Sequence, residues 1–272
     1  MLQVMASVVS AALGRDSLLV RNLRPAYEST LDWLDGGRGI EWEINGVLYR
    51  IDPHFRYLIN HDHESAVASF LRSRVKPGDL CFDVGANVGI YALQFAHWSA
   101  PGGRVVAFEP NPEACAALTK HVRINGLSGQ VTVEPLAVGD QQGNAVLYAA
   151  GSDTRSRLSQ PNDLIANRTV SSTVSMTSLS EFSRHNGLIP DWLLIDIEGL
   201  ELAALRGASE LILERRYKLG IVIEMHPGFW TILGTSRTEV EGLLRELRLH
   251  AVPLTGQADP LGEYGLVHLA FE

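Results

Sequence analysis

The sequence predicts an α/β fold with a doubly wound, largely parallel sheet. From about residue 65 onward, short apolar runs that suit buried strands alternate with segments whose apolar residues recur at helical spacing. Strands that alternate with helices form βαβ units, and such units place their strands parallel in one sheet. The 272 residues, of which 46% are hydrophobic, can form one large α/β domain with or without an extension.

The first 60 residues carry a different pattern, which predicts an N-terminal extension made of a helix and a β-hairpin. Residues 1–35 look helical and then loop-like. Residues 41–51 alternate between apolar and polar, and Asn45-Gly46 within them is a strong signal for a hairpin turn. We therefore expect the main domain to cover residues 61–272.

Start and stop signals define the first elements of the main domain. Pro77-Gly78-Asp79 ends a first helix. Asn111 is a predicted N-cap, Pro112 suits the first helical position, and Asn125-Gly126 closes that helix. The predicted elements are, in order, a helix over 65–74, a strand over 80–84, a helix over 90–98, a strand over 104–108, a helix over 112–124 and a strand over 131–138.

The second half of the chain continues the alternation after a polar interruption. Residues 143–150 resemble an added β segment, and residues 151–167 are polar without periodicity, which is typical of a flexible loop. The remaining predicted elements are strands over 192–197, 219–225 and 265–271, and helices over 201–214 and 238–247.

The central stretch at residues 80–89 joins a strand to a helix through a glycine-spaced turn, Asp83-x-Gly85-x-Asn87-x-Gly89. Gly85 can adopt backbone angles that other residues resist, and it allows a ligand to approach the main chain. The helix that follows would present free N–H groups and a partial positive charge. The turn therefore predicts a ligand with a carboxylate or phosphate at this end.

Other glycine-rich motifs fit this turn less well. A dinucleotide fingerprint, G-x-G-x-x-G, has a glycine where Asn87 stands, and the Gly-Lys-Ser/Thr of a phosphate-binding P-loop is absent. A purely structural turn between strand and helix, without a ligand, remains the alternative at this point.

Glu109 follows the second predicted strand, 20 residues after Gly89. A carboxylate at this place can accept hydrogen bonds from both hydroxyls of a ribose, as acidic residues do in dinucleotide-binding folds. The alternative is a charge that favours the N-terminus of the next helix. The glycine turn upstream favours ribose binding.

Asp196 and Glu198 come at the end of the fourth predicted strand, where ligands bind in this architecture. They would face opposite sides of a regular strand, but both can reach the cleft if the chain turns at Gly199. Such a pair could orient a substrate, hold a divalent cation or take a proton. Glu198 could instead serve only the N-terminus of the following helix.

His226 follows Glu224 at the end of the fifth predicted strand and is a candidate general base, because imidazole titrates near neutral pH. A structural histidine in the core is the alternative. His61 and His63 are secondary candidates from the segment before the first helix of the main domain.

Four motifs, in this order, resemble the FkbM family of methyltransferases: Asp83-Val-Gly-Ala-Asn-Val-Gly89, Phe108-Glu-Pro-Asn111, Asn125-Gly126 and Ile195-Asp-Ile-Glu-Gly-Leu-Glu201. The match covers roughly residues 64–226, and its last motif is distinctive. The resemblance implies a class I, Rossmann-like methyltransferase fold with S-adenosylmethionine as the methyl donor. Members usually methylate a hydroxyl oxygen on a sugar or natural product.

The resemblance also implies roles for single residues. Asp83, Gly85 and Asn87 would face the methionine end of the cofactor, Glu109 the ribose, and residues near Ala137 the adenine. Many members have a lysine two residues before the Asp of the last motif, where this chain has Leu194. The residues predicted to bind the cofactor are Asp83, Gly85, Ala86, Asn87, Gly89, Glu109, Pro110, Asn111 and Ala137, and those predicted to be catalytic are Asp196, Glu198 and His226.

Composition limits the class of partner and the compartment. The formal net charge is −8 and no Lys/Arg-rich run is present, which argues against a nucleic-acid partner. No apolar run approaches the ~20 residues of a membrane span. Cys81 and Cys115 fit buried apolar positions, and no Lys or Arg precedes the apolar residues 1–13. We therefore expect a cytoplasmic enzyme that acts on a small molecule with a hydroxyl group as the methyl acceptor. Assembly into a homo-oligomer is compatible with the sequence.

Three other functions remain open on these residues alone. The first is transfer of a methyl group to nitrogen or carbon, which the motifs do not exclude. The second is a nicotinamide-dependent oxidoreductase on a similar sheet, against which Asn87 speaks. The third is a binding module that keeps the fold without turnover.

Overall fold

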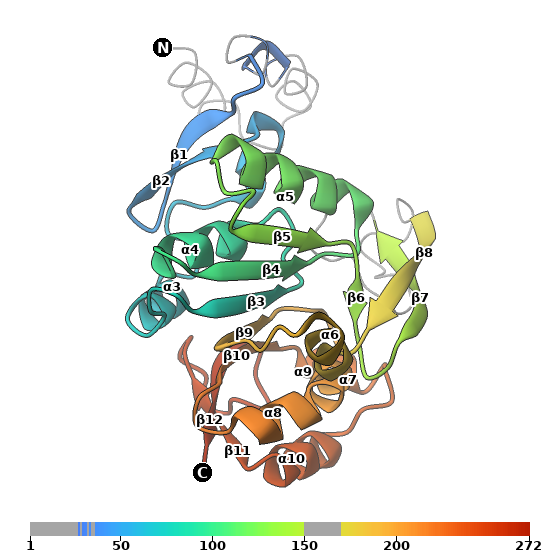
Figure 1. Ribbon diagram of the computed structural model, residues 1–272. Coiled ribbons are helices and arrows are strands. Elements are labelled where there is room, and N and C mark those ends of the chain that lie inside the picture. The colour runs from blue at the N-terminus through green and yellow to red at the C-terminus, as the bar shows by residue number, and fades with distance from the viewer. Residues whose placement is uncertain (1–26, 28, 32, 34–35, 150–169) are drawn as a thin grey trace. The chain divides into compact units, whose positions relative to one another are not determined.

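The computed structural model describes residues 27, 29–31, 33, 36–149 and 170–272 of the chain (Figure 1). The chain divides into two compact units, residues 1–62 and residues 63–272, and each is described by itself. Most of the predicted helical stretch at 1–35 and the predicted loop at 151–167 lie outside the described residues. Within the described part, no helix is both long and apolar enough to cross a lipid bilayer.

The first unit contains the predicted hairpin. Strands β1 (Ile40–Ile44) and β2 (Val47–Ile51) pair antiparallel. Asn45 and Gly46 both have positive φ, +49° and +80°, which is the backbone of a two-residue hairpin turn. A short 3₁₀ helix, η1 (Pro53–Leu58), follows. His61 belongs to this unit, where its Nδ1 lies 2.7 Å from the carbonyl oxygen of Glu43.

The second unit is built on a seven-stranded sheet with the order β11-β12-β10-β9-β3-β4-β5. The strands from β10 to β5 run parallel, and β12 is antiparallel to both of its neighbours, so the predicted largely parallel sheet is confirmed. Along the chain, the strands follow one another from the central β3 through β4 to β5 on one side. The later strands β9 and β10 then lie on the other side of β3. The strands are β3 (Leu80–Val84), β4 (Arg104–Phe108), β5 (Val131–Glu134), β9 (Trp192–Ile195), β10 (Gly220–Met225), β11 (Leu249–Pro253) and β12 (Gly265–Phe271).

Helices cover both faces of this sheet, as a doubly wound fold requires. Alternate residues of β3 serve the two faces: Cys81 packs with the helices of one face and Phe82 with those of the other. The first face carries α3 (Ser65–Arg72), α4 (Ile90–Trp98) and α5 (Pro112–Ile124). The second carries α6 (Leu179–Asn186), α7 (Glu201–Gly207), α8 (Ser209–Arg215) and α10 (Arg237–Glu246).

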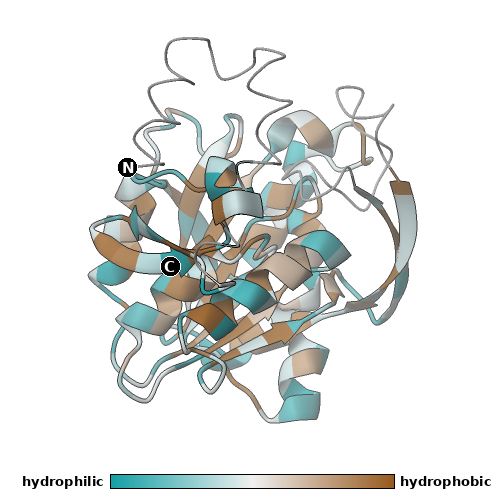
Figure 2. Cartoon of the chain, turned by 90° about the horizontal axis from the view of Figure 1, so that it is seen from above, coloured by the Kyte–Doolittle hydropathy of each residue, from teal (hydrophilic) through white to brown (hydrophobic). Residues whose placement is uncertain are grey.

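The central strands are apolar along their whole length because both of their faces are buried. All five residues of β3 are buried, including Asp83, and so are all four of β9. Figure 2 shows the strands of the sheet as mostly hydrophobic, with hydrophilic segments on the surrounding helices. The short helix α9 (Pro227–Trp230) follows β10 directly.

The chain departs from the sequence prediction in several places: α6, α9, β11 and β8 (Val170–Thr177) were not predicted, and two predicted elements are divided. The predicted strand 131–138 ends at Glu134, because Pro135 has no N–H with which to continue the ladder. Residues beyond it form β6 (Ala137–Val138) in a separate sheet with the order β6-β8-β7, built with β7 (Gly143–Ala149) and β8. The predicted helix 201–214 is two helices, α7 and α8, which meet at Ala208.

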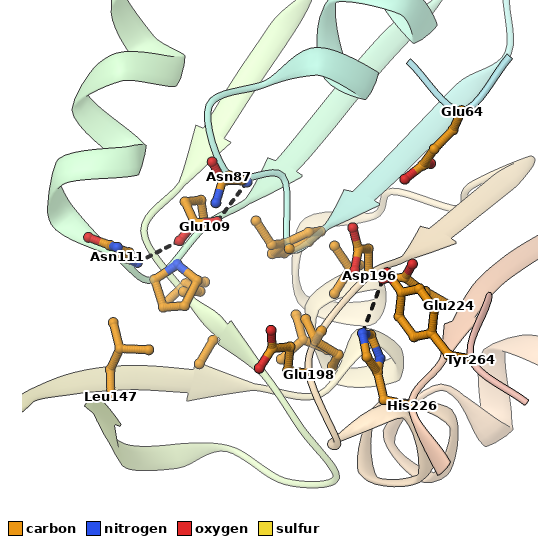
Figure 3. Close-up of a pocket in the computed structure, with 18 of the residues that line it drawn as sticks. Glu64, Asn87, Glu109, Asn111, Leu147, Asp196, Glu198, Glu224, His226 and Tyr264 are labelled. Atoms are coloured by element: carbon orange, nitrogen blue, oxygen red, sulfur yellow. Dashed lines mark hydrogen bonds and ion pairs between the residues drawn. The ribbon is translucent and has the colours of Figure 1, made fainter. Parts of the chain in front are cut away.

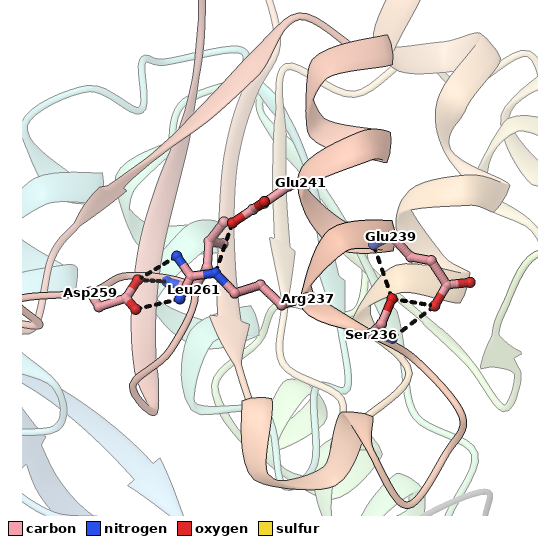
Figure 4. Close-up of polar contacts among 6 residues, drawn as sticks. All are labelled: Ser236, Arg237, Glu239, Glu241, Asp259 and Leu261. Atoms are coloured by element: carbon pink, nitrogen blue, oxygen red, sulfur yellow. Dashed lines mark hydrogen bonds and ion pairs between the residues drawn. The ribbon is translucent and has the colours of Figure 1, made fainter.

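The helix signals in the sequence correspond to real caps. The Asn111 side chain accepts a hydrogen bond from the N–H of Glu113 at 3.0 Å. At the start of α10, Ser236 and Glu239 form a reciprocal capping box, with distances of 3.2 and 2.8 Å (Figure 4). Arg237 then pairs with Asp259, which ties α10 to the segment between β11 and β12.

Candidate active site

A cavity of about 250 Å³ opens at the carboxyl ends of β3, β4, β9 and β10, where the strand order reverses (Figure 3). This is the place at which open α/β sheets bind ligands. The described residues that line it belong to the unit 63–272. They are His63, Glu64, Val84, Gly85, Asn87, Phe108, Glu109, Pro110, Asn111, Leu136, Ala137, Val138, Leu147, Asp196, Ile197, Glu198, Glu224, His226 and Tyr264.

The turn between β3 and α4 forms one wall of the cavity. Gly85 has φ +83°, and a Cβ atom there would lie 1.9 Å from the carbonyl oxygen of Asp196. Glycine is therefore required both by the backbone angle and by the close approach of the segment after β9. Asn87 has φ +47°, a left-handed conformation that asparagine tolerates. Its side-chain oxygen accepts from the N–H of Val88 at 2.7 Å.

The turn does not present free N–H groups to a ligand, contrary to the expectation from the sequence. The N–H groups of Gly85 and Ala86 both donate to the carbonyl of Phe108 at 3.0 Å, and that of Gly89 donates to Ala86 at 2.8 Å. The N–H of Asn87 donates to Glu109 at 2.7 Å. The N–H groups of this turn therefore do not form an anion cradle.

Glu109 links two turns at the cavity wall. One of its carboxylate oxygens accepts from the N–H of Asn87 and the other from the N–H of Asn111, both at 2.7 Å. Burial raises the pKa of Glu109 to about 7, although these two hydrogen bonds act in the opposite direction. Each oxygen keeps a second lone pair. Glu109 can therefore hold its two turns and still accept bonds from a diol in the cavity.

Asp83, Ala86 and Gly89 lie at the turn but do not line the cavity. Asp83 is only 2% exposed, and its carboxyl accepts a hydrogen bond from the backbone of Ala92 in the first turn of α4. Burial, together with the nearby charge of Glu109, raises the pKa of Asp83 to about 7. Asp83 thus acts on the shape of the turn, since it satisfies a helix N–H that no cap residue reaches.

An apolar wall stands next to Glu109. It is formed by Leu136, Ala137 and Val138 from the segment around β6 and by Leu147 from β7. The sequence pointed only to Ala137, because the second sheet that carries this wall was not expected. An apolar slot beside a diol-binding carboxylate suits the flat face of a purine ring.

Asp196 and Glu198 both line the other end of the cavity. Strand β9 ends at Ile195, so the two residues belong to the loop that follows it. Gly199 has φ +80°, which turns the chain and removes the strict alternation of a strand. Figure 3 shows the Glu198 carboxylate between the Glu109 end and the cluster around Asp196.

His226 lies between two carboxylates. Its Nδ1 is 2.6 Å from Glu201, and its Nε2 is 3.2 Å from Glu224. Burial lowers the pKa of His226, but the hydrogen bonds and charges of Glu201 and Glu224 outweigh burial and raise it to about 10. Without a ligand, the imidazole is therefore a cation at neutral pH. A base must have a nitrogen without a proton, so the role of His226 as a general base stays a prediction that requires the loss of one of these protons.

Glu201 is the side chain that holds His226 in place. It is 1% exposed, and besides His226 it accepts from the N–H of Gly199 at 3.1 Å and from the indole of Trp230 at 3.2 Å. It thereby joins the loop after β9 to α9. No role was predicted for Glu201 from the sequence, although the residue lies within the last of the four motifs.

Asp196, Glu224 and His226 form a compact cluster, with one ligand-type atom of each within 4.8 Å of the others. Burial and the charge of Glu224 raise the pKa of Asp196. Burial would also raise the pKa of Glu224, but hydrogen bonds from His226, Asp196 and Tyr264 lower it to about 2. Tyr264 has no signal in the sequence, since only the turn before β12 brings it here.

His63 and Glu64 complete the wall at this end. The hydroxyl of Tyr91 donates to Glu64 at 2.6 Å, and the Tyr91 ring meets that of His63 edge to face at 5.6 Å. Burial raises the pKa of Glu64, and burial lowers that of His63. Of the two secondary histidines, only His63 reaches the cavity.

Comparison with known proteins adds a family match. The model of the methyltransferase FkbM domain matches residues 83–249. The chain is 45% identical over 69 residues to the 31-O-demethyl-FK506 methyltransferase FkbM of Streptomyces tacrolimicus, which is 25% of each chain. It is 27% identical over 172 residues to the hexuronic acid methyltransferase AglP of Haloferax volcanii, over 61% of this chain and 63% of that protein. The matches thus span less than two thirds of either relative.

Solved structures resemble the chain more loosely. An FkbM methyltransferase from Methylobacillus flagellatus has a TM-score of 0.47 and 17% identity, over 72% of this chain and 44% of that one. An rRNA-methylase-like protein from Clostridium thermocellum has a TM-score of 0.48 and 13% identity, over 76% and 93%. The fold assignment therefore rests on the strand order described above.

Proposed function

Because the chain belongs to the FkbM methyltransferase domain family, whose model matches more than half of it, we propose that it is an S-adenosylmethionine-dependent O-methyltransferase. The acceptor in this proposal is a hydroxyl group on a sugar or a natural-product small molecule. The observation that carries the proposal is a single cavity with two chemically different ends, one suited to a nucleoside and the other to a polar acceptor.

The nucleoside end supports S-adenosylmethionine as the donor. Glu109 has oxygens available to a ribose diol, and the apolar wall around Ala137 lies beside it for the adenine. The methionine part would then extend along Gly85 and Asn87 toward the loop after β9. This orientation brings the sulfonium methyl toward Asp196 and Glu198.

The names of two relatives support an oxygen acceptor. One of them acts on a 31-O-demethyl compound, which implies a hydroxyl as the methyl acceptor, and the other on a hexuronic acid. Both acceptors are polyoxygenated small molecules. An acidic cavity end with several hydrogen-bond acceptors suits hydroxyl groups of this kind.

The reaction is an in-line displacement at the methyl carbon. The acceptor oxygen forms a bond to the methyl group while the methyl–sulfur bond breaks, and the sulfonium becomes a neutral thioether. The hydroxyl proton must go to a base. With both nitrogens of His226 engaged, we assign this role to the carboxylate of Glu198, which lines the cavity outside the Asp196–Glu224–His226 cluster.

Methyl transfer to nitrogen or carbon is the nearest alternative, because donor binding would be the same. A nicotinamide-dependent oxidoreductase is a further alternative, and the turn at Gly85 offers it no diphosphate cradle, since its N–H groups are occupied. Product analysis and a comparison of nucleotide ligands separate these functions.

Calorimetry with S-adenosylhomocysteine and NAD on the full chain tests donor binding. We expect S-adenosylhomocysteine to bind and NAD not to bind. Glu109→Gln should weaken binding about 10- to 100-fold, since hydrogen bonds to a charged group contribute roughly 1.5–3 kcal/mol. Glu113→Gln, an exposed control at the start of α5, should leave the affinity unchanged. Equal affinity for Glu109→Gln and Glu113→Gln would remove Glu109 from the donor site.

Turnover is tested with uronic acids, neutral sugars and macrolide alcohols as acceptors, with mass spectrometry of the products. The proposal expects a methyl ether on an alcohol of one of these classes. Methylation only of amines in a matched amine panel would replace O-transfer with N-transfer. Glu198→Gln should lower turnover by about 10²–10⁴-fold while donor affinity stays the same.

A further inference from the structure

We propose that Asp196, Glu224 and His226 form a divalent-cation site at the acceptor end of the cavity, and that Glu201 is the positioning residue of this site. The cation binds to the chain itself. Its role in methyl transfer, to hold the acceptor oxygen, rests on the function proposed above.

The geometry suits a shared ion. The three ligand-type atoms come from the loop after β9 and the end of β10, and all lie within 4.8 Å of one another. Ligand atoms around one small divalent ion lie about 2.0–2.2 Å from it, and therefore about 3–4.5 Å from one another. Side-chain adjustments of less than an ångström would bring these three into that range.

A second observation concerns Glu201, which contacts His226 but is not one of the three proposed ligands. Glu201 is buried and fixes the Nδ1 face of His226 at 2.6 Å, while Gly199 and Trp230 donate to the same carboxylate. Only Nε2 of His226 then faces the cluster, and an ion bound there would take the place of the proton on that nitrogen while Nδ1 keeps its bond to Glu201. A carboxylate behind a histidine is the usual support of a metal-ligating imidazole, because it fixes both the ring orientation and the tautomer.

The charges of the cavity also favour a bound cation. Among the described residues, no Lys or Arg lines the cavity. Five carboxylates do, those of Glu64, Glu109, Asp196, Glu198 and Glu224. The Asp196 and Glu224 carboxylates lie within 4.8 Å of one another, and a cation between them would offset the repulsion of their charges.

The donor set narrows the choice of ion. Two carboxylates with one imidazole suit Mn²⁺ and related first-row ions, because oxygen ligands alone would favour Mg²⁺ or Ca²⁺ and thiolates are absent. When bound, such an ion supplies Lewis acidity to an acceptor oxygen. Glu198 lies beside this cluster and takes the proton that the oxygen releases.

Mn²⁺ binding to the full-length chain tests the site without any turnover. Chelator-treated protein is titrated with Mn²⁺ while electron paramagnetic resonance follows the free ion. We expect one ion per chain in the absence of cofactor, and a higher melting temperature when the ion is bound. Asp196→Asn should abolish binding, and Glu201→Gln should weaken it about 10- to 100-fold. Glu246→Gln, an exposed glutamate of α10, should change nothing.

The possible outcomes separate this proposal from the function on which its catalytic role rests. No Mn²⁺ binding by the wild type, or equal binding by Asp196→Asn and Glu246→Gln in folded proteins, overturns the cation site. Loss of Mn²⁺ binding in Glu201→Gln together with unchanged S-adenosylhomocysteine affinity supports it, because a general unfolding would abolish both. Full turnover in excess chelator overturns the catalytic role of the ion. A chain that binds Mn²⁺ but no S-adenosylhomocysteine overturns the methyltransferase proposal alone.

Discussion

At the scale of single residues, the cavity depends on carboxyl groups whose pKa values burial has changed. Glu109 illustrates the consequence for binding, because a ribose diol donates hydrogen bonds and the carboxyl must be ionised to accept both of them. Its pKa of about 7 in the ligand-free protein means that near neutral pH a large fraction of the molecules carry a proton at this site.

We therefore predict that the affinity for S-adenosylhomocysteine falls as the pH falls below about 7. Below that pH the protein must release the Glu109 proton in order to bind, which reduces the affinity by up to about tenfold per pH unit. Above it, Glu109 is already ionised and this dependence disappears. Calorimetry from about one and a half pH units below the pKa to about one and a half above it measures the profile. Glu109→Gln should flatten it, and an equally steep profile in that variant would assign the proton elsewhere.

Asp83 has a consequence for stability. Its ordinary pKa is 3.8, and burial together with Glu109 raises the pKa to about 7 in the folded chain. Between those pH values the folded protein holds a proton that the unfolded chain has lost. The free energy of unfolding must then decrease as the pH rises from about 4 to about 7, and this dependence ends above that window.

We predict that Asp83→Asn removes this part of the pH dependence. Asparagine keeps an oxygen for the Ala92 N–H but does not titrate. Relative to the wild type, the variant should gain stability with rising pH, at most about 1.4 kcal/mol per pH unit within the window. Urea unfolding at several pH values measures the difference. A constant difference between the two proteins across the window would mean that Asp83 is ionised in the folded chain.

At the scale of elements, the site is made by turns at the ends of β3, β4 and β9 that contact one another. The turn after β3 approaches the backbone after β9 so closely that a Cβ at Gly85 would lie 1.9 Å from an oxygen. Both turns lie at the carboxyl ends of neighbouring parallel strands. Their mutual fit is therefore part of the cavity wall.

We predict that Gly85→Ala lowers both stability and cofactor affinity, whereas Gly78→Ala lowers stability only slightly. Both glycines have positive φ, +83° and +90°, so both variants carry the same backbone strain of about 1 kcal/mol. Only at Gly85 does the added methyl group meet a backbone atom, since nothing lies within 4 Å of a Cβ at Gly78. Unfolding curves and S-adenosylhomocysteine calorimetry on both variants measure the contrast. Similar losses in the two variants would show that the turns can move apart.

The elements also show what local sequence can predict. The buried strands of the central sheet, the caps at Asn111 and the hairpin at Asn45 depend on neighbouring residues, and they were predicted correctly. Strand β8 was missed because its residues are mostly polar, Ser and Thr, and its burial depends on pairing with β6 and β7. The break at Ala208 was missed although Gly207, the last residue of α7, could have signalled it.

At the scale of the whole molecule, the acceptor end joins residues that lie far apart in the sequence. Glu64 comes from the start of α3, Glu201 from α7 and Tyr264 from the residue before β12. Strand-end positions such as Asp196 could be predicted, because parallel strands end at one edge of the sheet. The two contacts that hold His226 as a cation could not, since they depend on how α7 and β10 pack. For this reason the charge of His226 could not be predicted from the sequence.

The last prediction concerns the two units of the chain. We propose that residues 1–62 act on the acceptor and not on the donor, because the described residues at the nucleoside end of the cavity, around Glu109 and Ala137, all belong to 63–272. Folds of this kind commonly differ in substrate through additions outside the shared core. A chain restricted to residues 63–272 should therefore bind S-adenosylhomocysteine with nearly the affinity of the full chain, as measured by calorimetry. Its methylation of an acceptor found for the full chain should be strongly reduced. If donor binding and methylation fall together while circular dichroism shows the sheet intact, the first unit supports the core. If neither falls, the acceptor is recognised entirely within residues 63–272.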